Sequence, residues 1–376
     1  MKTLPDAGFP GGNIAVESVE GNAIRVKPDL RDTEGVWFYW CFRMQAAADS
    51  VYRFVFDRRV IGVRGPGVSL DGGMTWRWLG ADAVDGNTFA YTFPGENRDV
   101  RFSFGMPYQQ SDWERFMAGL RNDERVAAET LCSSRKGRAV ERVRFGRLDG
   151  GAAFRALLTC RHHACEMMAN YALEGIMIET LSDSEDGRWL QRHVEFAAVP
   201  FVDKDGVEDG DQGKNRRPHD HGQDYGLDTV YPEPAALRVW TEGWLDGRPA
   251  VALDLHCPGP RGNFHESVLF PCRVRSPENW ARMAPFFAAL EKGQSGVLAY
   301  RRSDGEDFFT WDGKPYRPPE RLRGFSPWAE TLPGMRFAAP LEIPYANANG
   351  REVNQETARA FGRDLARALC RSLSAD

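Results

Sequence analysis

Residues 154–176 read FRALLTCRHHACEMMANYALEGI and predict a buried strand, a polar turn and a helix, in that order. Residues 154–159 form the apolar run of the strand, and Met168, Tyr171 and Ile176 recur at helical spacing on one face of the helix. Further strand-like and helical runs alternate along the chain, at 194–202, 251–255, 277–290 and 358–369. Strands that alternate with helices indicate an α/β domain with a mixed or largely parallel sheet, flanked by helices.

The first 110 residues have a different pattern. Aromatic and β-branched runs recur there at short spacing, as at 36–42 and 51–56, and glycine-rich turns separate them. Short strands punctuated in this way indicate a β-sandwich. A chain of 376 residues is also long for one domain. We therefore predict an all-β sandwich domain at 1–110, followed by an α/β catalytic domain at 111–376.

The composition is that of a globular protein without a broad basic surface. Hydrophobic residues make up 42% and charged residues 27%, and the formal net charge of -5 argues against a nucleic-acid partner. No apolar run approaches the ~18 residues that a membrane helix needs, and residues 1–6 hold no apolar signal region. Seven cysteines without a CxxC pair indicate free thiols in a reducing compartment. We expect a cytoplasmic protein with no membrane partner, and leave the oligomeric state open.

All seven histidines lie in the middle of the chain, where we therefore expect its chemistry. His163 and Glu166 stand three residues apart where the predicted strand gives way to the helix, and such a pair can bind one metal ion. His162 competes with His163 on spacing alone, because Glu166 is then four residues away. His256 ends another apolar strand, at the end where open α/β sheets bind ligands. Two histidines and one glutamate leave a position open for water, as in catalytic zinc sites.

Glu342 is a carboxylate in the otherwise apolar segment 340–345. A buried carboxylate needs a partner, and a water molecule on zinc is a plausible one. Each of these residues alone also fits a structural role, as a polar helix start, a core histidine or a surface glutamate. As a set, they predict metal chemistry.

Taken in order, these motifs resemble the carboxypeptidase A-like family of zinc peptidases, and more closely its cytosolic carboxypeptidase branch. His163-Ala164-Cys165-Glu166 is similar to the family's His-Pro-Gly-Glu, and 203–207 to its Asn-Pro-Asp-Gly-Val. Asp254-Leu255-His256 is similar to its Asp-x-His, and Glu342 to its late Leu-Glu. The amino-terminal part also resembles the β-sandwich of that branch, at 37–39, 52–54, 91–94 and 106–108.

The resemblance implies one zinc ion per chain, with His163, Glu166 and His256 as its ligands. It implies that Glu342 is the general base, which takes a proton from water and returns it to the leaving amine. Asp220, at the position of the family's Asp-x-Asn-Arg motif, would accept a hydrogen bond from the outer nitrogen of His163 and fix its tautomer.

The long polar stretch 203–224 departs from the family pattern at two places that concern the substrate. Gly222-Gln223 stand where the family has the Asn-Arg pair that holds the terminal carboxylate of the substrate. Gly213 stands where it has a carbonyl-polarising arginine, and after a one-residue shift Lys214 would serve as a catalytic point charge. The basic run also fits a solvated loop. The predicted substrate-binding residues are Lys214, Arg216, Arg217 and Gln223.

The leading hypothesis is a zinc metallocarboxypeptidase that hydrolyses an amide or isopeptide bond at the carboxyl end of a peptide, with a weaker expectation of acidic residues nearby. A second reading is an amidase or deacylase that acts on N-acyl amino acids or cell-wall peptides. A third is a zinc-containing protein, impaired in catalysis, that only binds a peptide. The tyrosine that the family uses to contact substrate stays open among Tyr300, Tyr316 and Tyr345.

Overall fold

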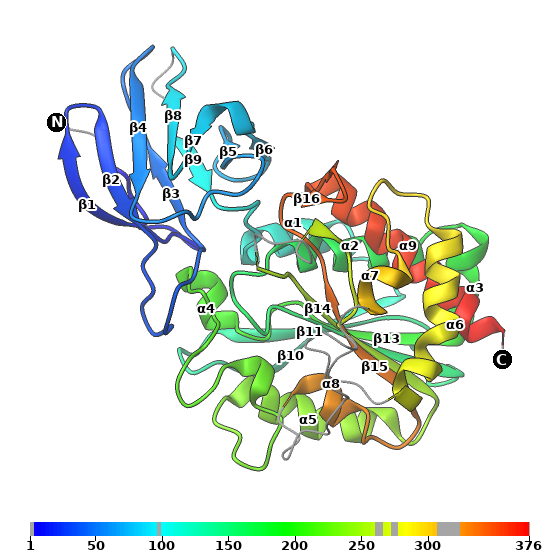
Figure 1. The fold of residues 1–376 in the computed structure, drawn as a ribbon. Helices are drawn as coiled ribbons and strands as arrows, with labels where there is room; N and C mark the ends of the chain where they lie inside the picture. Colours follow the sequence, from blue (N-terminus) through cyan, green and yellow to red (C-terminus); the bar gives the residue numbers. More distant parts are fainter. Residues whose placement is uncertain (1–3, 96–98, 260–265, 272–276, 307–323, 376) are drawn as a thin grey trace.

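The computed structural model describes residues 4–95, 99–259, 266–271, 277–306 and 324–375. An all-β part lies at the amino end, and a mixed α/β part follows it (Figure 1). The predicted fold class, a β-sandwich before an α/β domain, is confirmed.

The all-β part, here called the β domain, consists of two sheets. Strands β1, β2, β4, β8 and β7 form one in that order, and β3, β9, β5 and β6 form the other. Aromatic rings pack between the sheets, with the rings of Phe42 and Phe54 5.0 Å apart and those of Phe54 and Phe102 5.3 Å apart. The bounds are β1 Ala15–Glu20, β2 Ala23–Lys27, β3 Cys41–Met44, β4 Val51–Phe56, β5 Gly67–Ser69, β6 Arg77–Trp78, η1 Ala81–Ala83, β7 Val84–Asp85, β8 Thr88–Thr92 and β9 Val100–Ser103.

One expected strand is shorter than its sequence suggests. The aromatic run at 36–42 predicts a strand, but β3 begins only at Cys41. The main-chain N–H and C=O of Tyr39 are instead bonded to the side-chain amide of Gln212, a residue of the α/β part. A long-range contact therefore replaces the strand that the local pattern favours.

The α/β part is built on a six-stranded sheet in the order β10, β11, β13, β12, β14, β15. The first two pairs of neighbours are antiparallel, and β13, β12, β14 and β15 run parallel. These parallel strands are almost wholly buried, which explains their near-continuous apolar sequences. The bounds are β10 Val126–Ser133, β11 Ala139–Gly146, β12 Phe154–Cys160, β13 Val194–Val199, β14 Ala250–His256 and β15 Met335–Glu342; a small ribbon pairs β16 Asn347–Ala348 with β17 Arg351–Glu352.

Helices cover both faces of this sheet (Figure 1). Helices α2, α3, α6 and α9 pack on one face, and α5 and α8 lie on the other. The stretch 203–224 contains short helical turns, so it is more ordered than a plain loop. The bounds are α1 Gln110–Ala118, α2 Met168–Thr180, α3 Glu185–His193, α4 Lys204–Asp209, η2 His221–Gln223, α5 Pro232–Leu245, α6 Pro277–Gly293, α7 Arg302–Glu306, α8 Phe325–Ala329 and α9 Gln355–Ser374.

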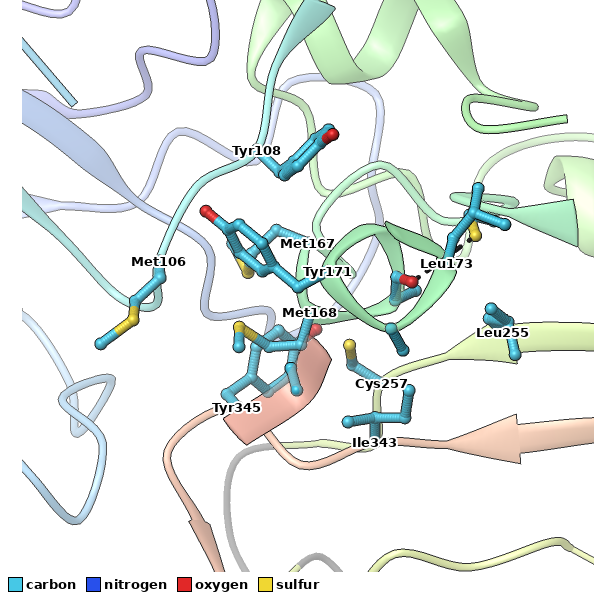
Figure 2. Packing of buried hydrophobic residues seen from close by; sticks show 14 of the residues in the cluster. Met106, Tyr108, Met167, Met168, Tyr171, Leu173, Leu255, Cys257, Ile343 and Tyr345 are labelled. Carbon is cyan, nitrogen blue, oxygen red and sulfur yellow. Dashed lines mark hydrogen bonds between the residues drawn. The ribbon is translucent and has the colours of Figure 1, made fainter. Parts of the chain in front are cut away.

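The β domain and the α/β part share one continuous hydrophobic core. Figure 2 shows the junction, where Met106 and Tyr108, which follow β9, approach α2. The rings of Tyr108 and Tyr171 are 4.9 Å apart, and the Tyr108 hydroxyl donates a hydrogen bond of 2.6 Å to Glu174. Close packing of buried side chains at this junction holds the β domain and the α/β part in one arrangement. In the described ranges, no helix combines the length and the apolar character needed to cross a lipid bilayer.

Candidate active site

The candidate residues meet at the carboxyl ends of three neighbouring parallel strands. His162 and His163 follow β12 after one residue, Arg161, whereas His256 is the last residue of β14 and Glu342 the last residue of β15. His256 and Glu342 are opposite each other in the strand register. Sheets of this kind bind ligands at these strand ends, so residues far apart in the sequence converge for a topological reason.

The three predicted metal ligands form one compact group. Their ligand atoms lie within 4.8 Å of one another, and the imidazole rings of His163 and His256 are 5.0 Å apart. Nδ1 of His163 is 3.0 Å from Oε1 of Glu166, and Nδ1 of His256 is 2.7 Å from Oε2 of the same carboxylate. Two imidazole nitrogens and one carboxylate this close together form a set of ligands that suits zinc.

A carboxylate faces the outer nitrogen of each of the two imidazoles. Nε2 of His256 is 2.6 Å from Oδ2 of Asp254, and Nε2 of His163 is 3.6 Å from Oδ1 of Asp220. Burial raises the pKa of Asp220, but the contact with His163 outweighs it and lowers the pKa to about 2. Carboxylates in this position fix which ring nitrogen is free to bind a metal. The structure thus places Asp220 beside the outer nitrogen of His163, at an ion-pair distance that is longer than a hydrogen bond.

His162 takes part in a different set of contacts. Its Nδ1 is 2.7 Å from Oδ1 of Asp254, and its Nε2 is 2.7 Å from the hydroxyl of Tyr225. His162, Asp254 and His256 form a second group close enough to hold a metal. However, both ring nitrogens of His162 contact groups outside the predicted ligand set, Asp254 and Tyr225, whereas Nδ1 of His163 faces Glu166. The geometry therefore favours His163 as the ligand.

Asp254 is the residue that the sequence analysis left without a role. It joins His162 and His256 and accepts a further hydrogen bond of 2.8 Å from Thr159. The sequence did contain a sign of this role. Residues two apart on a strand project from the same face, so Asp254 is expected on the same face of β14 as His256.

An Asp254→Asn substitution should weaken zinc binding by about 10- to 100-fold, the usual effect of losing a carboxylate behind a metal-binding histidine. Competition with a chelator of known zinc affinity measures this directly. Thr159→Val is the matched control, since it removes one contact of Asp254 and leaves both histidine contacts in place. Equal zinc affinities of the Asp254→Asn variant and the wild type would refute the role of Asp254.

Glu342 lies across from His256 in the strand register, with its carboxylate at the candidate metal site. Its Oε2 is buried and has no hydrogen-bond partner among the described residues. Burial raises the pKa of Glu342 above its ordinary value. A carboxylate that is held without a protein partner beside a metal site suits a base that accepts a proton from water.

Lys214 brings a buried positive charge to the metal site. Its Nζ is 2.5 Å from Oε1 of Glu166, and its side chain is only 12% exposed. Burial lowers the pKa of Lys214, but the charge of Glu166 outweighs this and raises the pKa above the ordinary value. The pKa of Glu166 is held well below its ordinary value, because His163, Lys214 and His256 together overcome the effect of burial.

Gly213 explains why this charge comes from position 214. A Cβ on Gly213 would lie 2.1 Å from the main-chain nitrogen of Ala164, and its φ of 74° favours glycine. A side chain such as arginine does not fit here without moving the turn that carries the metal ligands. The positive charge at this place therefore comes from the side chain of the next residue, Lys214.

A Gly213→Ala substitution should lower the free energy of unfolding by roughly 2–4 kcal/mol, from the strained φ and the steric overlap together. Urea denaturation measures this. Gly137→Ala is the matched control, because Gly137 has a φ of 80° but open space around its Cβ position. Equal losses in the two variants would show that the close approach to Ala164 contributes nothing.

Two of the other predicted substrate-binding residues, Arg216 and Arg217, pair with carboxylates outside the metal-ligand group. Arg216 is buried and paired with Asp203 at 2.5 Å, Asp211 at 2.7 Å and Asp32 at 2.9 Å. Arg217 is 82% exposed and pairs with Glu34 of the β domain. Gln223 is exposed on η2.

Two of the three candidate tyrosines are described, and both are buried. Tyr300 is fully buried, and the hydroxyl of Tyr345 is 3.7 Å from the sulfur of Cys165, in the turn between His163 and Glu166. Tyr316 lies outside the described residues.

The fold of this chain is similar to that of solved metallocarboxypeptidases. A metallo-carboxypeptidase from Burkholderia cenocepacia has a TM-score of 0.78 at 18% identity, with 100% of both chains covered. The Pseudomonas aeruginosa metallo-carboxypeptidase, solved with (2-guanidinoethylmercapto)succinic acid, has a TM-score of 0.75 at 20% identity, with 98% of both chains covered. The metallocarboxypeptidase fold therefore extends over the whole chain, as the motifs predicted.

Similarity in sequence is more limited. No family model matches the chain. An uncharacterised protein of Zymomonas mobilis is 28% identical over 212 residues, which cover 54% of this chain and 53% of that protein. Cytosolic carboxypeptidase 2 of Xenopus tropicalis is 27% identical over 157 residues, which cover 36% of this chain and 16% of that protein. The matched region thus spans about half of the first relative and a small part of the second.

Proposed function

We propose that this chain is a zinc-dependent metallocarboxypeptidase that hydrolyses an amide or isopeptide bond at the carboxyl end of a peptide. One observation carries the proposal: two histidines and a glutamate form a group that could hold a metal ion, and Glu342, whose Oε2 is buried with no hydrogen-bond partner among the described residues, lies on the neighbouring strand. The whole-chain likeness in fold to metallocarboxypeptidases supports it.

Each group has a separate task in this proposal. Zinc held by His163, Glu166 and His256 would polarise the carbonyl of the bond that is cleaved and lower the pKa of a water molecule. Glu342 would accept the proton of the attacking water and pass it to the leaving amine. Lys214 would attract the carbonyl oxygen or a carboxylate of the substrate as a fixed point charge. Any preference for acidic residues would rest on Lys214, because Arg216 is already paired with three carboxylates.

The test combines metal content with peptide cleavage. We expect about one zinc per chain by elemental analysis, and release of carboxyl-terminal residues from a panel of peptides followed by mass spectrometry. Stripping with a chelator should abolish the release, and added Zn²⁺ should restore it. Activity that is unchanged in the stripped protein would contradict the proposal.

A second candidate is an amidase or deacylase whose substrate has no free terminal carboxylate. The observation that favours it is the pair Gly222 and Gln223, which supply no positive charge beside the histidines. A Cβ on Gly222 would lie 3.3 Å from Nε2 of His163, so position 222 lies directly against the site. Faster cleavage of peptides with amidated ends, or of N-acyl amino acids, would select this function.

The same two positions test whether the chain only binds peptides. A Gly222→Asn/Gln223→Arg variant should release carboxyl-terminal residues faster if the chain is an impaired peptidase. A zinc-containing binding protein should stay inactive in both forms while it retains zinc and peptide.

A further inference from the structure

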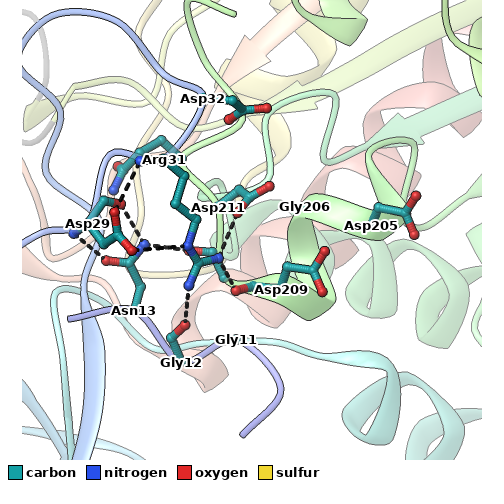
Figure 3. Close-up of polar contacts among 12 residues, drawn as sticks. Gly11, Gly12, Asn13, Asp29, Arg31, Asp32, Asp205, Gly206, Asp209 and Asp211 are labelled. Carbon is teal, nitrogen blue, oxygen red and sulfur yellow. Dashed lines mark hydrogen bonds and ion pairs between the residues drawn. The ribbon is translucent and has the colours of Figure 1, made fainter. Parts of the chain in front are cut away.

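Residues 208–216, here called the clamped segment, are held by the β domain along most of their length. The main-chain N–H of Gly11 donates to the carbonyl of Glu208 at 2.9 Å, and the buried side chain of Asn13 donates to the carbonyl of Gly210 at 2.8 Å. Figure 3 shows Arg31, which donates to Asp211 at 2.7 Å and to the carbonyl of Asp209. The clamped segment is thus part of the interface between the two domains.

The contacts continue to the end of the clamped segment. The side chain of Asn215 donates to the carbonyl of Glu34 at 2.8 Å, and Arg216 pairs with Asp32 at 2.9 Å. Lys214 precedes these two residues, and its Nζ lies 5.5 Å from the centre of the ring of Trp37, another residue of the β domain. The β domain therefore contacts Lys214, which brings positive charge to the metal site, and the two residues that follow it.

Gln212 connects the β domain with the metal ligands. Its side chain is fully buried and bonds both main-chain groups of Tyr39, accepting from the N–H at 2.8 Å and donating to the C=O at 2.7 Å. Its own carbonyl accepts a hydrogen bond of 3.2 Å from the N–H of Cys165. Cys165 lies inside the turn between His163 and Glu166. Gln212 therefore contacts both the β domain and the turn that carries the metal ligands.

The next two residues extend this connection. The main chain of Gly213 lies directly against that of Ala164 in the same turn, with space for a hydrogen atom only. Lys214 follows and reaches Glu166. A displacement of Gln212 would consequently move the turn of the metal ligands and Lys214 together.

We propose that Gln212 is a positioning residue through which the β domain sets the geometry of the metal-ligand turn and of Lys214. The β domain then contributes to the geometry of the active site through its contacts with Gln212. The role of Lys214 in catalysis rests on the proposed function, but the positioning of the metal ligands does not.

The test compares Gln212→Leu with Gln294→Leu. Gln294, a half-buried residue just after α6 and outside the clamped segment, is the control, because its side chain also bonds both main-chain groups of one tyrosine, Tyr300, at 3.0 and 2.7 Å. In Gln212→Leu we expect zinc affinity to fall, and amide exchange at 161–167 to quicken, each by about tenfold, the effect of losing buried hydrogen bonds. Gln294→Leu should change neither quantity.

Zinc affinity is measured by competition with a chelator, and amide exchange by mass spectrometry, so neither measurement needs a substrate. Wild-type zinc affinity and exchange in Gln212→Leu, or equal changes in both variants, would overturn the proposal. Failure to cleave any peptide would refute the proposed function and leave these two measurements unaffected.

A milder pair of variants covers the case in which Gln212→Leu does not fold. Arg31→Gln removes contacts to the clamped segment, whereas Arg58→Gln removes an ion pair with Asp57 inside the β domain; the two arginines are similarly exposed, at 31% and 34%. Arg31→Gln should weaken zinc binding about threefold, in line with a loss of partly exposed hydrogen bonds to Asp209 and Asp211. Arg58→Gln should leave it unchanged, and the same value for both variants would count against the proposal.

Discussion

A Glu342→Gln variant should keep its zinc and lose at least about 10²-fold in kcat, which is the size of general-base effects. The amide has the shape of the carboxylate but does not accept a proton at neutral pH. Because Oε2 of Glu342 has no partner among the described residues, the substitution breaks no hydrogen bond there. The loss should therefore appear in the chemical step and leave the fold intact.

The measurement is the rate of peptide cleavage at saturating substrate, with zinc content determined on the same samples. Glu242→Gln on α5 is the control, because Glu242 is an exposed glutamate far from the strand ends of the site.

The stability of the Glu342→Gln variant gives a second readout. Burial raises the pKa of Glu342, so its ionised form is disfavoured in the folded, zinc-free protein, and the substitution should not lower the free energy of unfolding there. Turnover that survives in Glu342→Gln would refute the assigned mechanism.

The fold and the core of the site follow from local sequence features. The periodicity of 154–176 predicts strand, turn and helix, and the structure has β12, the His163–Glu166 turn and α2 in this order. His256 ends an apolar run, and parallel strands bring such ends to one edge of a sheet, so its place beside His163 can be anticipated from the sequence. Glu342 stands inside an apolar segment, and only the structure ends β15 at this residue.

The roles of the charged residues in 203–217 depend on which acids the fold brings near, and sequence does not supply that. Lys214 and Arg216 are two residues apart in one basic run, yet Lys214 reaches the metal site and Arg216 is paired with three carboxylates. One of these three, Asp32, comes from the β domain. The strand expected at 36–42 is shortened for the same kind of reason, since Gln212 bonds the main chain of Tyr39.

A Glu166→Gln variant should lose zinc affinity by more than about 100-fold, because it removes a direct ligand where the loss of a supporting carboxylate already costs 10- to 100-fold. It should also destabilise the zinc-free protein. In that state Glu166 is the carboxylate that pairs with the buried ammonium of Lys214. Removal of one member of a buried ion pair leaves the other charge uncompensated, at a cost of roughly 3–5 kcal/mol.

A double variant separates these two effects. Glu166→Gln combined with Lys214→Met removes both charges, so the zinc-free protein should regain much of the lost stability, while zinc binding stays weak. Urea denaturation of the zinc-free proteins and chelator competition measure the two quantities independently. A double variant that is no more stable than Glu166→Gln would show that Lys214 does not depend on Glu166 for its compensation. In that case the charge of Lys214 would have to be balanced by another group, and its place beside the metal ligands would need a different explanation.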